Sequence, residues 1–213
     1  MKRAIVLIIT VLLLSGCVNI TKSDYNEIIN EAVSSNKKIY NTYRSGYKFY
    51  LPSGLYIENS KDYNEVIKSV DDLYYLYIDI ISYLNKKESP YVINEKSLYS
   101  DSISHQNKSG YIEINEQKEK YLVEIMYNYA KIEVMVDEKD LKKSVSNAII
   151  ILSSIKYNDG ILENLTKENV LSYSEENVDI FSTNGKEKSN FLEYVETYDA
   201  DDENSVPDYD LIK

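Results

Sequence analysis

Apolar residues recur at helical spacing in two parts of the chain. Residues 23–43 place their apolar positions on one face of a helix, with Ser23 as the expected N-cap and Gly46 just beyond the end. This stripe comprises Ile28, Ile29, Ala32, Val33, Ile39, Tyr40 and Tyr43. A second helix is expected from Asp137, as its cap, to about Ser153. Its buried stripe has helical periodicity and comprises Leu141, Val145, Ala148, Ile149 and Leu152.

Several other segments show the alternation, or the aromatic and β-branched content, that is typical of strands. Residues 47–51 and 55–58 are expected to pair around the turn Pro52-Ser53-Gly54. Residues 63–68 fit either a strand or a short helix, and residues 73–84 fit one long central strand. The clearest strand patterns are residues 111–115, 121–127 and 131–136, and a turn near Asn128 is expected to join the last two in a hairpin. Residues 155–157 are expected to form a last short strand.

The N-terminal residues have the pattern of a secretory signal peptide. Met1-Lys2-Arg3 supplies positive charge, and residues 4–14 form an apolar segment interrupted only by Thr10. A basic start, an apolar stretch of this length and small residues before a cleavage site define such a signal. The apolar segment is too short to span a bilayer comfortably, which argues against a permanent transmembrane helix.

The signal ends in Leu14-Ser15-Gly16-Cys17. This ending, an aliphatic residue followed by two small residues and a cysteine, resembles the lipobox of bacterial lipoproteins. The resemblance implies cleavage between Gly16 and Cys17, a diacylglyceryl group on the Cys17 sulfur and often a further acyl chain on the new amino terminus. It places the protein on the extracytoplasmic face of the cell membrane. The alternative is an ordinary secretory signal that leaves Cys17 as a free thiol.

Charge and cysteine content narrow the classes of function. The chain carries a formal charge of −11, and removal of residues 1–16, whose only charged residues are Lys2 and Arg3, brings the mature part to −13. Such an acidic domain is poorly suited to binding nucleic acid or an anionic membrane surface. Cys17 is the only cysteine, so disulfides within the chain are excluded and stability must come from a packed core.

The chain divides into a signal peptide, a lipidated tether, an α+β domain and an acidic C-terminal extension. These comprise residues 1–16, 17–22, 23–157 and 158–213. Within the domain, residues 86–108 are expected to form a surface loop with up to one short strand. The extension is expected to dock partly on the domain, with one amphipathic helix in residues 188–198, and to be disordered at its end.

Two motifs carry a resemblance to a known fold. Phe49-Tyr50-Leu51-Pro52-Ser53-Gly54 is an aromatic-rich strand followed by proline and glycine, and Ile151-Leu152-Ser153-Ser154-Ile155 follows a helix. Together they resemble the opening and the final helix and strand of the PsbP-like fold, which is found in an extrinsic photosystem subunit and in small bacterial lipoproteins. The resemblance covers about residues 47–157. It implies an antiparallel β-sheet with flanking helices, and a binding or assembly module more often than an enzyme.

Candidate catalytic and metal-binding groups are few. His105 is the only histidine and lies in a serine-rich segment, where neither a catalytic triad nor a histidine metal site can be assembled around it. The glycines stand alone, which excludes a P-loop and a dinucleotide fingerprint. The acidic segment from Asp199 to Asn204 lacks the glycine and the final glutamate of an EF-hand, since Asn204 and Asp210 stand in their places. We expect a solvated acidic tail there, with weak calcium binding as the alternative.

Asp79 and a set of tyrosines have both a structural and a functional interpretation. Asp79 interrupts an apolar strand and is expected to point to solvent or to pair with a lysine; the alternative is a buried carboxylate with a perturbed pKa. Packing on the sheet is expected for most of the tyrosines, although an exposed patch would serve to recognise sugars or a protein. These tyrosines are Tyr74, Tyr75, Tyr77, Tyr83, Tyr127 and Tyr129.

The expected function is therefore that of a membrane-anchored, non-catalytic binding or assembly module of the cell envelope, without metal or cofactor. Its expected partners are the bilayer, through the acyl chains on Cys17, and an envelope protein or glycan, but no nucleic acid. One alternative is a lipoprotein that captures a small ligand for a transporter. The other is an envelope hydrolase, which would need titratable groups clustered in a cleft.

Overall fold

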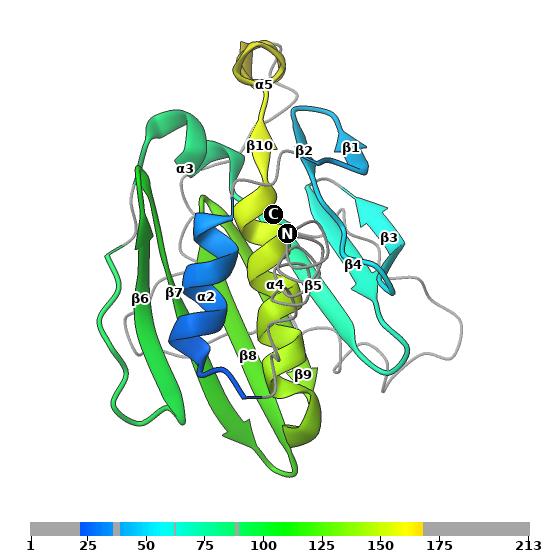
Figure 1. The fold of residues 1–213 in the computed structure, drawn as a ribbon. Helices are drawn as coiled ribbons and strands as arrows, with labels where there is room; N and C mark the ends of the chain where they lie inside the picture. The colour runs from blue at the N-terminus through cyan, green and yellow to red at the C-terminus, as the bar shows by residue number, and fades with distance from the viewer. Residues whose placement is uncertain (1–21, 36–38, 62, 88–89, 168–213) are drawn as a thin grey trace, which may run out of the picture.

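The computed structural model describes residues 22–35, 39–61, 63–87 and 90–167 and shows an α+β fold with two antiparallel sheets and a few helices (Figure 1). In spatial order, the seven-stranded sheet consists of β3 (Tyr56–Lys61), β4 (Asn64–Lys68), β5 (Leu73–Ile78), β9 (Ala130–Val136), β8 (Lys120–Tyr127), β7 (Lys108–Gln117) and β6 (Tyr99–His105). The three-stranded sheet consists of β1 (Thr42–Arg44), β2 (Tyr47–Phe49) and β10 (Lys156–Tyr157). The helices are α2 (Tyr25–Ser34), α3 (Ile80–Asn85), the 3₁₀ helix η1 (Glu138–Asp140), α4 (Leu141–Ser154) and α5 (Asp159–Lys167).

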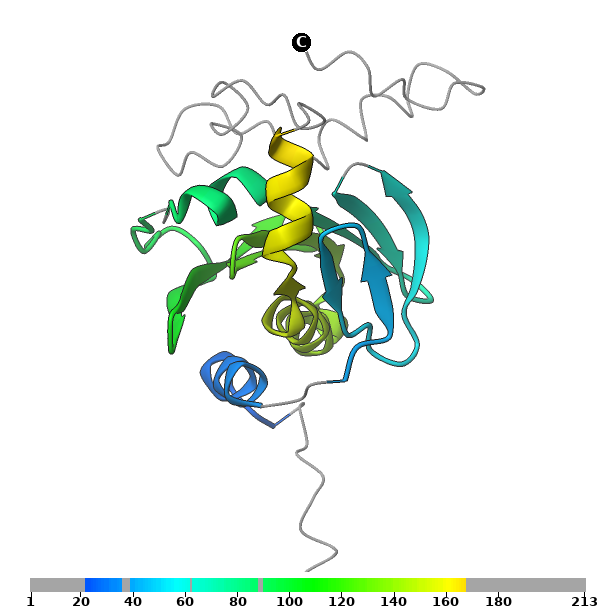
Figure 2. The same ribbon diagram turned by 90° about the horizontal axis from the view of Figure 1, so that it is seen from above.

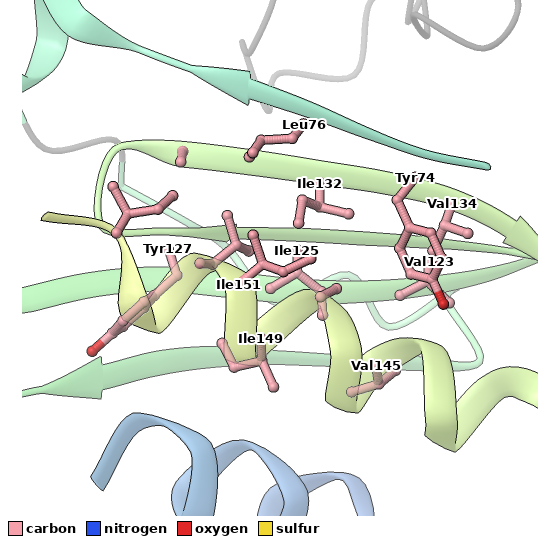
Figure 3. Packing of buried hydrophobic residues seen from close by; sticks show 14 of the residues in the cluster. Tyr74, Leu76, Val123, Ile125, Tyr127, Ile132, Val134, Val145, Ile149 and Ile151 are labelled. Atoms are coloured by element: carbon pink, nitrogen blue, oxygen red, sulfur yellow. The ribbon is translucent and has the colours of Figure 1, made fainter. Parts of the chain in front are cut away.

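The core lies between α4 and one face of the seven-stranded sheet. Because successive residues of a strand point to opposite faces, alternate residues of β5, β8 and β9 all point toward α4. Figure 3 shows the side chains that meet there, which include Tyr74, Leu76, Val123, Ile125, Ile132, Val134, Val145 and Ile151. Figure 2 shows α2 beside α4 on the same side of the sheet. Each fully buried aliphatic side chain contributes roughly 1.5–3 kcal/mol to folding.

The predictions with the clearest local pattern are confirmed. The predicted helix is present as η1 followed by α4, and all five residues of its predicted stripe are buried. Asp137 precedes η1 as predicted, but its side chain makes no capping hydrogen bond. The hairpin predicted near Asn128 joins β8 to β9. Asn128 and Tyr129 have φ values of 56° and 60°, the positive values that a type I′ turn requires. The short strand predicted at residues 155–157 is present as β10.

The first helix is shorter than its apolar pattern predicts. It ends at Ser34, and Tyr43 lies in β1 instead. Its N-cap is Asp24 and not Ser23. The Asp24 carboxylate accepts the Glu27 N–H (2.7 Å), and the Glu27 carboxylate accepts the Asp24 N–H (3.3 Å), so both free donors are satisfied reciprocally. Gly46, predicted just beyond the helix, forms the turn between β1 and β2 with a φ of 89°.

The predicted pairing of residues 47–51 with residues 55–58 is wrong. β2 pairs with β1 and β10 in the small sheet, whereas β3 pairs with β4 in the large one. β1 and β10 occupy the two edges of β2, so no edge of β2 is left for the segment after Pro52, which pairs in the other sheet. The ambiguous segment at residues 63–68 is a strand, β4.

Residues 73–84 do not form one long strand, because the chain changes structure at Asp79. β5 ends at Ile78 and α3 begins at Ile80. Asp79 is 6% exposed, and its carboxylate accepts the N–H of Ser82 (2.8 Å), which caps α3. The expectation that Asp79 points to solvent or pairs with a lysine is therefore wrong. Residues 86–108, expected to be mostly loop, contain the seven-residue strand β6.

Part of the predicted C-terminal extension lies within the described residues. α5 places Leu162, which is fully buried, against Gly46. A β-carbon on Gly46 would lie 2.3 Å from the Leu162 Cδ2 atom, so glycine is required there for the packing as well as for the turn. The signal peptide, Cys17, residues 188–198 and the acidic tail lie outside the described residues.

An ion pair joins the two sheets. The Arg44 guanidinium of β1 donates to the Glu65 carboxylate of β4 through two hydrogen bonds of 2.6 and 2.9 Å, and the Tyr47 hydroxyl donates to the same carboxylate at 2.8 Å. The Glu65 side chain is fully buried, whereas the Arg44 side chain retains 28% of its exposure. A buried carboxylate needs such a paired, bidentate cation to offset its lost hydration.

We expect Arg44→Ala to destabilise the protein by about 3 kcal/mol, because it leaves the buried Glu65 without its counter-charge. Urea unfolding followed by circular dichroism would measure the loss. Lys68→Ala is the matched control, since Lys68 pairs with Glu58 on the surface of the same sheet at 2.9 Å and should change stability little. Equal losses in the two variants would show that the Arg44–Glu65 pair does not hold the sheets together.

We expect Asp24→Ala to cost about 1 kcal/mol of unfolding free energy, because the first turn of α2 loses its side-chain cap. Ser23→Ala, one residue earlier, should leave the urea midpoint unchanged. A larger effect at Ser23 than at Asp24 would restore Ser23 as the cap.

Candidate functional site

The second face of the seven-stranded sheet, opposite α4, carries a row of three glutamates. The strand register places Glu113 of β7 opposite Glu124 of β8, and Glu124 opposite Glu133 of β9. Glu113 is 6% exposed and Glu133 only 1%. Like charges directly opposite each other destabilise a sheet, so neighbouring groups must compensate for this row.

Lys131 and Tyr111 compensate for the charge of Glu124 and Glu133. Lys131 lies two residues before Glu133 and therefore on the same face. Its Nζ atom is 2.5 Å from Glu133 Oε1 and 3.6 Å from Glu124 Oε2. The Tyr111 hydroxyl donates to Glu124 Oε1 at 2.6 Å. Burial, followed by the Glu124 charge, raises the pKa of Tyr111, which keeps this hydroxyl protonated as a donor.

Glu113 accepts hydrogen bonds from the segment that joins α3 to β6 and one from Asn115 of its own strand, β7. The Tyr91 hydroxyl donates to Glu113 at 3.1 Å, and the amides of Asn94 and Asn115 donate at 2.8 and 2.9 Å. The Tyr91 ring also stacks on the Tyr111 ring, with centroids 4.3 Å apart. The glutamate row therefore holds the segment around Tyr91 and Asn94 against the sheet.

Glu133 remains the least compensated carboxylate of the row. Its Oε2 atom is buried and accepts no hydrogen bond within the described part of the chain. Burial raises the pKa of Glu133; Lys131 opposes the shift and Glu124 adds to it. A proton on Glu133 would be able to bridge to Glu124, since two ionised carboxylates have no donor between them. A raised carboxyl pKa is a requirement for some acid–base chemistry but is not sufficient for it.

The predicted site residues do not meet at this row. Cys17, Gly16 and the acidic tail lie outside the described residues. His105 ends β6, five residues from Ser100, whose strand position is opposite Glu113. Within the described ranges, no three or more histidine, cysteine, aspartate or glutamate side chains are grouped so that they could hold a metal ion.

The six tyrosines considered for recognition do not form one patch. Tyr74 and Tyr127 are buried on the α4 side, and the Tyr74 hydroxyl is 3.0 Å from Ser144 Oγ. Tyr75 and Tyr77 are partly buried on the opposite face. Tyr83 and Tyr129 lie at the end of the sheet where β8 turns into β9, and their rings meet edge to face with centroids 5.6 Å apart. Packing therefore accounts for their distribution better than a single recognition surface does.

The glutamate row was not predicted from the sequence. The alternation of β9 correctly places Lys131 and Glu133 on the face opposite Ile132 and Val134. That pattern alone describes a solvated face. Only the register between β7, β8 and β9 shows that the three carboxylates are neighbours, and register depends on pairing that no single segment encodes.

No protein-family model matches the chain, and no curated protein matches it either. Among the helices of the described ranges, none has both the length and the apolar character needed to cross a bilayer.

We expect Glu133→Gln to stabilise the protein more at pH 8 than at pH 4. Because burial raises the pKa of Glu133, the folded protein keeps this proton to a higher pH than the unfolded chain does. Ionisation therefore opposes folding from about pH 4.5 upward, and does so fully above the raised pKa. Glutamine does not ionise, so the variant lacks this unfavourable contribution to the folding free energy. Lys131 still has Glu124 as an ion-pair partner in the variant. Urea midpoints at both pH values would measure the difference.

Glu116→Gln is the control for this pH dependence, because Glu116 is exposed on β7. Its substitution should change the urea midpoint little at either pH. The same change for Glu133→Gln at pH 4 and pH 8 would show that Glu133 is not held in an unfavourable ionised state.

Proposed function

We propose that the protein is a lipid-anchored lipoprotein of the extracytoplasmic face of the cell membrane, and that its domain is a non-catalytic binding or assembly module of the cell envelope. The observation that carries the proposal is the sequence Leu14-Ser15-Gly16-Cys17 at the end of a basic and apolar leader. Cys17 is the only cysteine of the chain and stands at the one position where the lipid would be attached.

Physical arguments support the anchor. Each buried methylene of an acyl chain contributes about 0.8 kcal/mol, so two or three chains on Cys17 would hold the domain stably. The mature part has a charge of −13, once Lys2 and Arg3 are removed from the total of −11. Attraction to an anionic bilayer would not retain such a domain, so membrane association would depend on the lipid.

We also propose that residues 47–157 have the PsbP-like fold. Three features support this finer assignment: the Pro52-Ser53-Gly54 turn after β2, the antiparallel sheet covered by helices, and the succession of α4 and β10. The pairing of β10 with β2 brings the two ends of this region together.

The contacts of the glutamate row favour a binding module over an enzyme. Lys131, Tyr111, Tyr91 and Asn94 engage its carboxylates in contacts that hold the fold. A substrate would have to displace these groups before it reached Glu124 or Glu133. The acidic charge also makes nucleic acid an unsuitable partner, so we propose an envelope protein or glycan.

We expect Cys17→Ser to abolish lipid attachment and membrane retention without unfolding the domain. Wild-type protein expressed in a bacterium that processes lipoproteins should enter the detergent phase of a Triton X-114 separation. Intact-mass measurement should show a chain that begins at Cys17 and carries diacylglyceryl. The Cys17→Ser variant should lose the lipid mass and enter the aqueous phase.

A matched serine substitution away from the anchor controls for general damage. Ser23→Ala should keep the lipid and partition with the wild type. A wild-type protein that is secreted with a free Cys17 thiol would overturn the anchor and establish the ordinary secretory signal instead.

A further inference from the structure

The outward face of the three-stranded sheet is positively charged. Tyr47 and Phe49 point inward and are buried, and the alternation of the strands places Tyr43, Lys48 and Lys156 on the other face. The register aligns these three in one row, with Lys48 opposite both Tyr43 and Lys156. Figure 1 shows the three strands side by side, with α5 following β10. We name the row of Tyr43, Lys48 and Lys156 the basic face.

The two lysines of the basic face lie directly opposite each other, which is unfavourable for like charges. In the glutamate row, Lys131 and Tyr111 compensate for such a repulsion. By contrast, neither Lys48 nor Lys156 pairs with a carboxylate of the described residues. The Lys48 Nζ atom lies 4.4 Å from the centroid of the Tyr40 ring, a neutral group that leaves the charge of the pair unchanged. The basic face therefore requires negative charge from elsewhere.

The negative charge of the mature chain is concentrated in its C-terminal part. Thirteen acidic and three basic residues give residues 168–213 a formal charge of −10. Residues 17–167 account for only −3 of the −13 of the mature part. Six of the acidic residues, and no basic one, lie within residues 199–210, which we name the acidic segment. The chain thus contains a strongly charged complement to its own basic face.

The described part of the chain ends near the basic face. Eleven positions separate Lys156 from Lys167, and nine residues form α5, which adds about 14 Å at 1.5 Å per residue. A flexible chain of the 32 steps from Lys167 to Asp199 has an r.m.s. span of about 30 Å. The acidic segment can therefore fold back onto the basic face, at an effective concentration on the order of millimolar.

We infer that the acidic segment docks on the basic face of the same molecule, where its carboxylates pair with Lys48 and Lys156. The contact supplies the negative charge that the lysine pair lacks and holds the C-terminal part of the chain on the domain. Exposed ion pairs are individually weak and are screened by salt, so the contact weakens at high ionic strength. An anionic partner from outside has to displace the acidic segment before it reaches the two lysines. The inference goes beyond the proposed anchor and does not depend on the lipid at Cys17.

The test uses zero-length cross-linking of the full mature chain with a carbodiimide, which joins lysines to carboxylates in contact with them. Tryptic peptides analysed by mass spectrometry identify the lysines that are joined to residues 199–210. Lys118 is the control, because it is also exposed and carries the same charge but lies in the turn between β7 and β8. An equal mixture of unlabelled and ¹⁵N-labelled protein separates links within one molecule from links between two copies.

We expect cross-links from the acidic segment to Lys48 and Lys156 to be at least fivefold more abundant than those to Lys118. They should join peptides of the same isotope label. Their yield should fall at least threefold between about 20 mM and 500 mM NaCl, because salt screens exposed charges. Equal yields at Lys48, Lys156 and Lys118 would overturn the inference, and links of mixed label would assign the basic face to a second copy instead.

A second measurement uses protection of the acidic segment from proteolysis. Substitution of both lysines, Lys48→Gln with Lys156→Gln, should at least double the initial rate at which Glu-C protease cleaves after Glu203. Lys118→Gln should leave this rate unchanged. If the double variant is cleaved at the wild-type rate while dextran sulfate protects Lys48 and Lys156 of the wild type from acetylation, the basic face serves an external polyanion and the inference is wrong.

Discussion

Packing of α4 on one face of the seven-stranded sheet is the interaction on which the other features depend. Val145, Ala148, Ile149, Ile151 and Leu152 of α4 are all fully buried. They cover the alternate residues of β5, β8 and β9, and a one-residue slip of any of these strands would turn its apolar side chains away from the helix. The helix thus fixes the register of the strands beneath it.

The same constraint creates the polar second face. Once Ile132 and Val134 face α4, Lys131 and Glu133 must point the other way, and the register aligns Glu133 with Glu124 and Glu113. A glutamate row is unfavourable by itself. Its hydrogen bonds with Tyr91 and Asn94 nevertheless give the segment before β6 a fixed position. An unfavourable row in the sheet is thereby coupled to a surface segment that would otherwise have few contacts.

The elements that could be predicted from the sequence are those that depend only on residues close together in the chain. The stripe of α4 and the β8–β9 hairpin depend on spacing and turn residues within a few positions, and both are present. One long strand was wrongly predicted for residues 73–84, because tyrosine and isoleucine suit a strand along the whole segment. The N–H of Ser82 donates to the Asp79 carboxylate instead, and this cap begins a helix. The pairing of β2 with β10 could not be predicted, because β10 lies more than 100 residues away in the chain. The glutamate row depends on such pairing as well, whereas Cys17 could be proposed because its motif is contiguous.

Contacts of Tyr83 hold together the end of the domain that contains α3 and α5. Tyr83 stacks on Tyr157 with ring centroids 3.8 Å apart, and its hydroxyl donates to Asp159 at the start of α5. Burial, followed by Asp159, raises the pKa of Tyr83 to about 12, which keeps that hydroxyl protonated. Lys86 lies over the same ring, 4.1 Å from its centroid. These contacts order α3 and α5 relative to the sheet. α2 begins at the other end of the sheet, beside Tyr99 at the start of β6, so the tether proposed for Cys17 would leave α3 and α5 on the far side of the domain from the bilayer.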